Sequence, residues 1–145
     1  MKKNVALIDD DEGPILFYQM ALEDAGFGVI RLRSFIEALE FVSQPDPTPD
    51  FWVIDVMMSV RDGSLCESGE NVSEKTNMGL GAGIFLYQMV KKSSPLVPAV
   101  LLTSISTPDL LDDIERALKS DDSCESKLDV LPQDLVALVE RRLKR

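Results

Sequence analysis

The stretch Val5-Ala-Leu-Ile-Asp9-Asp10-Asp11-Glu12 sets four apolar residues directly against four carboxylates. A short apolar run that stops at a polar cluster is typical of a buried strand. Pro14 follows, and proline suits the first turn of a helix, where its missing N–H costs nothing. Leu16 and Met20 then continue at helical spacing, and Gly26 is typical of a helix end. The stretch therefore predicts a strand followed by a helix, with acidic side chains at the junction.

The same strand-and-helix unit recurs along the chain, which predicts an α/β fold with a parallel sheet. The polar stretch 59–79 has little periodicity, and we expect it to be a long inserted loop after the third strand. We expect a single domain over 1–145, with a five-stranded parallel sheet, helices on both faces and no output domain. The expected strands are 5–8, 27–32, 51–54, 99–102 and about 124–130, and the expected helices begin near Pro14, Ser34, Ala82, Pro108 and Pro132.

The amino-acid composition excludes several classes of function. The chain has 145 residues, 45% of them apolar, with 15 Lys or Arg against 25 Asp or Glu and a net charge of −10. Such acidity argues against a nucleic-acid partner and an anionic membrane surface, and no apolar run is long enough for a transmembrane helix. The absence of histidine excludes Ser-His-Asp and Cys-His triads and the common catalytic zinc sites. Two cysteines do not make a disulfide framework, and we expect a cytoplasmic protein.

Polar residues end three of the expected strands, namely Asp9 and Asp10, Asp55, and Thr103. In an open parallel sheet, ligands bind at the carboxyl ends of the strands, so we expect these side chains to converge. Neighbouring carboxylates repel one another unless a cation joins them, and a few hard oxygen ligands suit Mg²⁺. A Mg²⁺ site beside a hydroxyl and a lysine is typical of phosphoryl transfer, which depends on positioning and charge neutralisation.

This ordered set of motifs resembles the receiver domain of two-component response regulators, the CheY-like family with a flavodoxin-like (βα)5 fold. Val5–Asp11 resembles the first strand and acidic pair, Phe51–Met58 the phospho-acceptor strand, and Val100–Ser104 the strand that ends in the switch hydroxyl. Lys127 falls about where the family has its invariant lysine, and Lys119 is a nearby competitor for that position. The resemblance covers nearly the whole chain and depends on the combination, since each motif alone is weak.

The resemblance implies a stand-alone receiver, which is a signalling domain rather than an enzyme. Asp55 would accept a phosphoryl group from a phosphohistidine on a sensor histidine kinase or a histidine phosphotransfer protein. A conformational change would then relay the signal to a downstream protein. Lys127 would pair with one phosphoryl oxygen, and Thr103 would hydrogen-bond another. The implied Mg²⁺ ligands are Asp10, Asp9 (directly or through water), Asp55 and the backbone carbonyl of Met57.

Three features depart from the family pattern. The segment between Asp55 and Thr103 is longer than is typical of the family. Leu128 stands where the family usually has a proline after the lysine, often in cis. We expect a trans bond here, because a cis bond without proline costs about 3 kcal/mol. The stretch 120–126 holds no aromatic residue, although the family normally has an aromatic switch there. The phosphorylation site is thus expected to be intact, without its usual aromatic readout.

Two other interpretations stay open. The chain also resembles the haloacid-dehalogenase phosphohydrolases, with Asp9 as nucleophile and Asp11 as acid and base in a small phosphatase. The remaining phosphohydrolase motifs would be filled by Thr103 or Ser104, a later lysine, and Asp121 with Asp122. In that interpretation Asp55 has no role, and the pair Asp121 and Asp122 does not follow an apolar strand.

The second alternative is a phosphorylation-independent pseudo-receiver that acts as a docking module.

Overall fold

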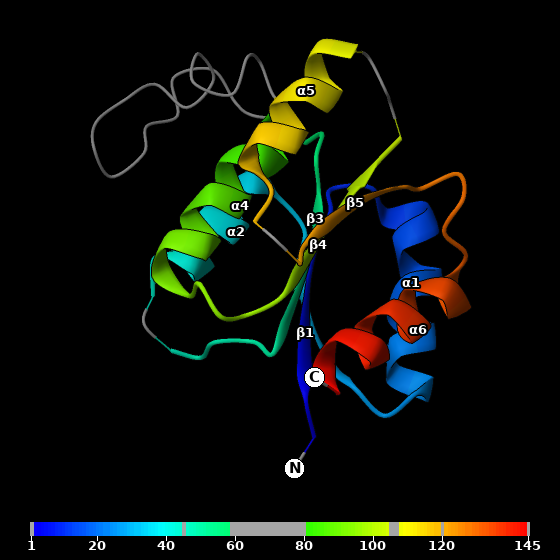
Figure 1. Cartoon of the computed structure of the whole chain (residues 1–145). Helices are drawn as coiled ribbons and strands as arrows, with labels where there is room; N and C mark the ends of the chain where they lie inside the picture. Colours follow the sequence, from blue (N-terminus) through cyan, green and yellow to red (C-terminus); the bar gives the residue numbers. More distant parts are fainter. Residues whose placement is uncertain (1, 45, 59–80, 105–107, 120, 145) are drawn as a thin grey trace.

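The computed structural model describes residues 2–44, 46–58, 81–104, 108–119 and 121–144. Within these ranges, five strands form one parallel sheet in the order β2-β1-β3-β4-β5, and helices cover both of its faces (Figure 1). This confirms the predicted architecture. In chain order the elements are β1 (Asn4–Ile8), α1 (Glu12–Asp24), β2 (Gly28–Leu32), α2 (Phe35–Val42), β3 (Phe51–Asp55), α4 (Ala82–Ser93), β4 (Ala99–Thr103), α5 (Pro108–Ala117), β5 (Ser123–Ser126) and α6 (Pro132–Leu143).

Side-chain alternation along the central strands divides the core into two layers. In β1, Val5 and Leu7 pack with α1 and α6, whereas Ala6 and Ile8 pack with α2, α4 and α5. Figure 1 shows the same division, with α1 beside α6 on one face and the other three helices on the opposite face. Strands β3 and β4 are buried at every position. Both are covered on two sides, and this is why they read as continuous apolar runs in the sequence.

The fifth strand differs from its expected range. It ends at Ser126, whereas the sequence interpretation extended it to about 130. Its four residues are half-buried and, apart from Cys124, polar; they join the sheet through main-chain pairing with β4. The chain turns after Lys127, because the amides of Asp129 and Val130 donate to the Ser126 carbonyl at 3.0 and 3.1 Å. Lys127 therefore lies just beyond the carboxyl end of this strand.

The helices begin close to where the sequence placed them. The Ser34 hydroxyl accepts the amide of Glu37 at 3.1 Å, which confirms the predicted cap of α2. The loop expected at 59–79 lies outside the described residues. Within the described ranges, the recorded cis peptide joins Asp46 and Pro47, so the Lys127–Leu128 bond is trans, as expected. None of the described helices has both the length and the apolar character needed to cross a membrane.

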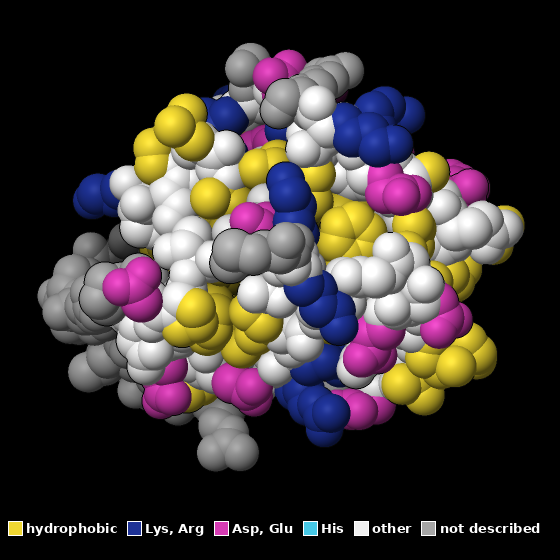
Figure 2. All heavy atoms as spheres, turned by 90° about the horizontal axis from the view of Figure 1, so that it is seen from below, with side chains coloured by type: hydrophobic (Ala, Val, Ile, Leu, Met, Phe, Trp, Pro, Cys, Tyr) yellow, Lys and Arg dark blue, Asp and Glu magenta, His cyan; other side chains and the backbone are white. Residues whose placement is uncertain are grey.

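Basic side chains gather at the end of the molecule opposite the carboxyl ends of the strands. Figure 2 views this end and shows Lys and Arg through the middle of the face, with acidic and apolar side chains around them. The start of the chain and the last turns of α4 and α6 reach this end, and the helix dipole favours cations at such positions. These segments carry Lys2, Lys3, Lys91, Lys92, Arg141 and Arg142.

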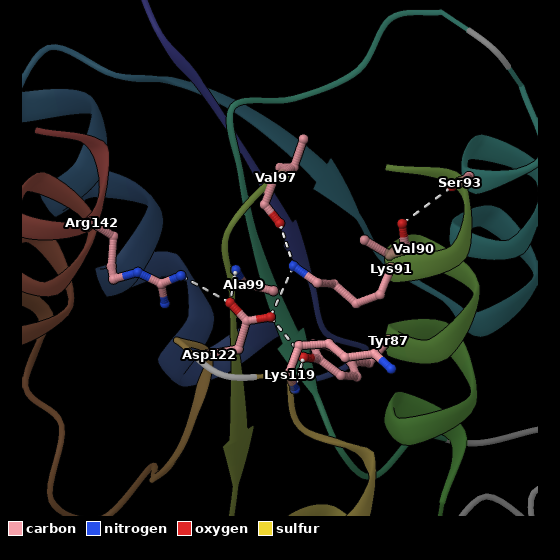
Figure 3. Close-up of polar contacts among 9 residues, drawn as sticks. All are labelled: Tyr87, Val90, Lys91, Ser93, Val97, Ala99, Lys119, Asp122 and Arg142. Atoms are coloured by element: carbon pink, nitrogen blue, oxygen red, sulfur yellow. Dashed lines mark hydrogen bonds and ion pairs between the residues drawn. The ribbon is translucent and has the colours of Figure 1, made fainter. Parts of the chain in front are cut away.

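A buried polar cluster, which the sequence did not predict, joins α4, β4 and α6 (Figure 3). The Oδ1 atom of Asp122 accepts Arg142 Nη2 at 3.0 Å and the Ala99 amide at 3.1 Å. Its Oδ2 atom accepts Lys91 Nζ at 2.9 Å and the Tyr87 hydroxyl at 2.7 Å. Burial alone would raise the pKa of Asp122, but these hydrogen bonds lower it overall. We call these four side chains, those of Tyr87, Lys91, Asp122 and Arg142, the Asp122 cluster.

Helix α4 approaches the end of β3 very closely at Gly83. The Gly83 amide donates to the Val56 carbonyl at 2.8 Å. A Cβ atom at Gly83 would overlap the backbone of Asp55 and Val56. Only glycine permits an approach of this kind. The contact fixes the main chain at the point where β3 presents Asp55.

We expect Gly83→Ala to lower the free energy of unfolding by about 1–3 kcal/mol, because the backbone must shift to admit the methyl group. Gly13→Ala is the matched control, since a Cβ atom there would make an ordinary contact with Asp11 Oδ1 at 3.6 Å. The control should be neutral, or gain up to about 1 kcal/mol from helix propensity. Chemical denaturation measures both variants, and equal stability of Gly83→Ala and wild type would contradict the close approach.

Candidate functional site

The structure brings together the carboxylates at the ends of β1 and β3. Ile8 and Ile54 are paired in the sheet, so Asp9 and Asp55 follow on adjacent strands. One oxygen from each of Asp9, Asp10 and Asp55 lies within 4.8 Å of the others. Asp9 is 2% and Asp55 3% exposed, whereas Asp10 is open to solvent. Two of the three carboxylates are thus withdrawn from water.

Lys127 reaches both buried carboxylates from the end of β5. Its Nζ atom lies 2.7 Å from Asp9 Oδ2 and 3.3 Å from Asp55 Oδ1. Burial would lower the pKa of Lys127, but the two carboxylates outweigh it and raise the pKa, so the ammonium group stays charged. The competing Lys119 has an exposed side chain, and its amide donates to the Tyr87 hydroxyl beside the Asp122 cluster (Figure 3). The structure therefore places Lys127, and not Lys119, among the strand-end carboxylates.

The environment of Asp55 disfavours the ionised form of its carboxyl group. Burial is the largest cause and nearby Asp9 the next, and together they raise the pKa of Asp55 to about 7 against the opposing effect of Lys127. The Met57 amide donates to Asp55 Oδ1 at 3.3 Å, so the main chain of Met57 adjoins the site. The role of the Met57 carbonyl as a metal ligand stays a prediction. Without a further cation, the protonated form of Asp55 is therefore favoured more than it is for an aspartate in water.

Thr103 ends β4 beside these groups. It is buried, and its carbonyl accepts the Lys127 amide at 2.9 Å. Leu102, the residue before it, pairs with Asp55 in the sheet. The main chain of Thr103 therefore lies between the strand that carries Asp55 and the segment that carries Lys127. We call Asp9, Asp10, Asp55, Thr103 and Lys127 the strand-end site.

The strand-end site fits a divalent cation. Three carboxylates face one ammonium group, so negative charge remains when all of them are ionised. Carboxylate oxygens are the ligands that Mg²⁺ prefers, and Mg²⁺ keeps several waters when it is bound by few protein groups. The solvent-open side chain of Asp10 leaves room for such waters. The residues that could hold the metal are Asp9, Asp10 and Asp55.

The phosphohydrolase interpretation does not agree with the structure. It requires the Asp121-Asp122 motif to approach Asp9, which follows the carboxyl end of β1. Instead, Asp122 accepts the amide of Ala99, the first residue of β4, and so lies at the amino end of the parallel sheet. Its carboxylate is already occupied by the two cations of the Asp122 cluster.

Helix α1 makes one contact near the site that the sequence did not predict. Leu16 and Met20, which continue at helical spacing, are each 50% exposed, while Ile15 and Tyr18 are buried. The Tyr18 hydroxyl donates to the Val130 carbonyl at 2.7 Å. Apolar periodicity can place a tyrosine ring in a core, but it carries no information about which distant carbonyl the hydroxyl will meet.

Comparisons with known proteins agree with this geometry. No family model and no curated protein matches the chain by sequence. A CheY-like response regulator receiver domain protein from Methanospirillum hungatei is similar with a TM-score of 0.73 and 17% identity, over 99% of this chain and 95% of that one. The chain has the receiver fold. The BeF3-activated DrrB receiver domain gives 0.69 and 22% identity over 100% of both chains. Vibrio cholerae chemotaxis protein CheY4 gives 0.68 and 18% identity, over 97% of this chain and 98% of that one.

We expect Asp10→Ala to weaken Mg²⁺ binding by about tenfold or more, because a hard-oxygen ligand is lost. The fold should persist, since Asp10 is exposed and its removal relieves repulsion among carboxylates. Calorimetric titration with MgCl₂ measures the dissociation constant. Asp24→Ala, an exposed aspartate at the end of α1, is the control and should bind as wild type does. Unchanged affinity in Asp10→Ala would contradict the assignment.

Asp55→Asn should stabilise the metal-free protein by a clearly larger margin at pH 8 than at pH 5. The folded pKa of Asp55 is about 7, above its unfolded value, so folding takes up a proton between these pKa values. The wild type therefore loses stability as pH rises from about 4 to about 7, by about 1–4 kcal/mol, and the variant does not. Urea denaturation in chelator at both pH values measures the difference. Asp24→Asn is the control, and a pH-independent effect of Asp55→Asn would refute the prediction.

Proposed function

We propose that this chain accepts a phosphoryl group on Asp55 from a phosphohistidine donor in a Mg²⁺-dependent reaction, and relays the signal by a conformational change. The observation that carries the proposal is the position of Lys127 Nζ against both buried carboxylates, beside exposed Asp10. A purely structural ion pair would not need three converging carboxylates and one lysine at the ligand-binding edge of the sheet. The receiver fold supports the same conclusion.

The chemistry follows from the charges of the site. A carboxylate oxygen of Asp55 attacks the phosphorus of the phosphohistidine, the N–P bond breaks, and the imidazole leaves with its electron pair. The product is an acyl phosphate. Mg²⁺, when bound, would supply positive charge to the carboxylates and to the phosphoryl oxygens. Asp55 must be ionised to attack, and this is the form that its burial disfavours in the absence of a cation.

Lys127 and Thr103 supply the other contacts in this proposal. The Lys127 ammonium group, which pairs with Asp9 in this structure, would neutralise a phosphoryl oxygen as charge develops. The Thr103 hydroxyl would bind another oxygen from the end of β4. The added charge would approach −2 in a buried setting, which is enough to alter the packing of the segments that carry both residues. A sensor kinase or phosphotransfer protein would supply the phosphoryl group, and a downstream protein would recognise the altered surface.

Treatment with acetyl phosphate and Mg²⁺ tests the proposal directly. We expect one phosphate on Asp55, detected by mass spectrometry and removed by hydroxylamine, and none in Asp55→Asn. Lys127→Ala should slow the reaction about 100-fold or more, since it removes the cation that faces the transferred group. It should still bind Mg²⁺, because the carboxylates remain.

Lys119→Ala is the matched control. Lys119 is an exposed lysine close in sequence, so its loss should leave the rate unchanged. A protein that takes no phosphate on Asp55 under these conditions would favour the docking-module interpretation. If Lys119→Ala alone slowed the reaction, the assignment of the lysine would be wrong.

A further inference from the structure

The hydroxyl of Tyr18 joins α1 to the segment that follows the site lysine. It donates to the carbonyl of Val130 at 2.7 Å, across 112 positions of sequence. The Tyr18 side chain is 5% exposed, and its ring packs in the core layer shared by α1 and α6. A buried hydroxyl with a short, direct acceptor defines a single position for the segment it holds.

The other hydrogen bonds of the turn after Lys127 are local, and the Val130 side chain also packs against the core layer shared by α1 and α6. The amides of Asp129 and Val130 donate to the Ser126 carbonyl, and the Leu128 amide donates to the Ser126 hydroxyl at 3.2 Å. These bonds close the turn on itself and set its shape. The Leu128 side chain is 82% exposed and adds no packing. Proline at this position would restrict the main chain, which leucine does not do.

Two hydrogen bonds to other elements therefore hold the main chain on either side of Lys127. At Lys127 itself, the main-chain amide donates to the Thr103 carbonyl at 2.9 Å. Three residues later, the carbonyl of Val130 accepts the Tyr18 hydroxyl. We infer that Tyr18 is a positioning residue for Lys127, because it fixes the turn that aims the ammonium group at Asp9 and Asp55. The inference rests on the proposed phosphoryl transfer, which it deepens.

The electrostatics of Tyr18 agree with this placement. Burial raises the pKa of the hydroxyl, Lys127 lowers it and Asp9 raises it. The hydroxyl therefore lies within electrostatic reach of the strand-end site without belonging to it. It remains a protonated donor at neutral pH, as the bond to Val130 requires.

Tyr18→Phe is the direct test, since it removes the hydroxyl and keeps the buried ring. We expect the maximal rate of phosphorylation by acetyl phosphate to fall about fivefold, the loss expected for one net hydrogen bond. The Mg²⁺ concentration that gives half-maximal rate should not change, because the carboxylates are untouched. Hydrogen exchange should become faster at the amides of 128–131. Rates are compared at a temperature well below the melting point of each variant.

Tyr87→Phe is the matched control, because the chain has just two tyrosines and both have buried, hydrogen-bonded hydroxyls. Tyr87 belongs to the Asp122 cluster at the amino end of β4 (Figure 3), whereas Lys127 lies at the carboxyl end of the sheet. Loss of the Tyr87 hydroxyl should lower stability while leaving both the phosphorylation rate and the exchange at 128–131 unchanged. If lower stability alone slowed phosphorylation, the rate would fall in both Tyr18→Phe and Tyr87→Phe.

Each outcome decides the inference. A slower rate together with faster exchange at 128–131, in Tyr18→Phe alone, supports it. A wild-type rate in Tyr18→Phe overturns it and leaves the proposed function standing. It is equally overturned by a slower rate with unchanged exchange, or by the same slowing in Tyr87→Phe. If the wild-type protein itself takes no phosphate, the proposed function fails first and this inference fails with it.

Discussion

Two buried carboxylates held by one lysine are the constraint on which the other features of this molecule depend. Asp9 and Asp55 lie at the carboxyl ends of two central strands, and their side chains have almost no contact with water. Burying a charge without a partner destabilises the folded state by roughly several kcal/mol. Lys127 pairs with both, so the end of β5 must lie where its lysine can reach them. Negative charge still remains beside Asp10. The same crowding that lowers the stability of the metal-free protein is therefore what prepares the site for a cation.

The sequence predicted those parts of the fold that depend on local pattern. Strands β1, β3 and β4 are continuous apolar runs, and topology alone brings Asp9 and Asp55 to one edge. The extent of β5 could not be read, because its residues pair through the main chain and give no apolar signal. The sequence also does not reveal the partners of Asp122, since Lys91 and Arg142 come from two helices far apart in the chain. Long-range pairing of polar groups leaves no periodicity in a sequence.

Polar contacts at both ends compensate for the weak apolar character of β5. Just before the strand, Asp122 accepts hydrogen bonds from α4, β4 and α6. Just after it, Lys127 pairs with Asp9 and Asp55. The strand between them is short and half-buried. An edge strand with so little apolar area would be held weakly by packing alone, so we attribute its register to the charged groups that bracket it.

The charge state of the site would give this edge strand a physical part in the proposed signalling. Without metal, protonation of Asp55 relieves the repulsion among the carboxylates. With a divalent cation the charges would balance, and Asp55 would become available as an anion. In the proposed function, a phosphoryl group on Asp55 would place negative charge on outer oxygens, and Lys127 would have a second acceptor in competition with Asp9. Since Lys127 is continuous with the turn that Tyr18 holds, that competition would act on the main chain between β5 and α6. A receiver fold with no aromatic residue in β5 would thus still connect the charge at Asp55 to the surface beyond the strand.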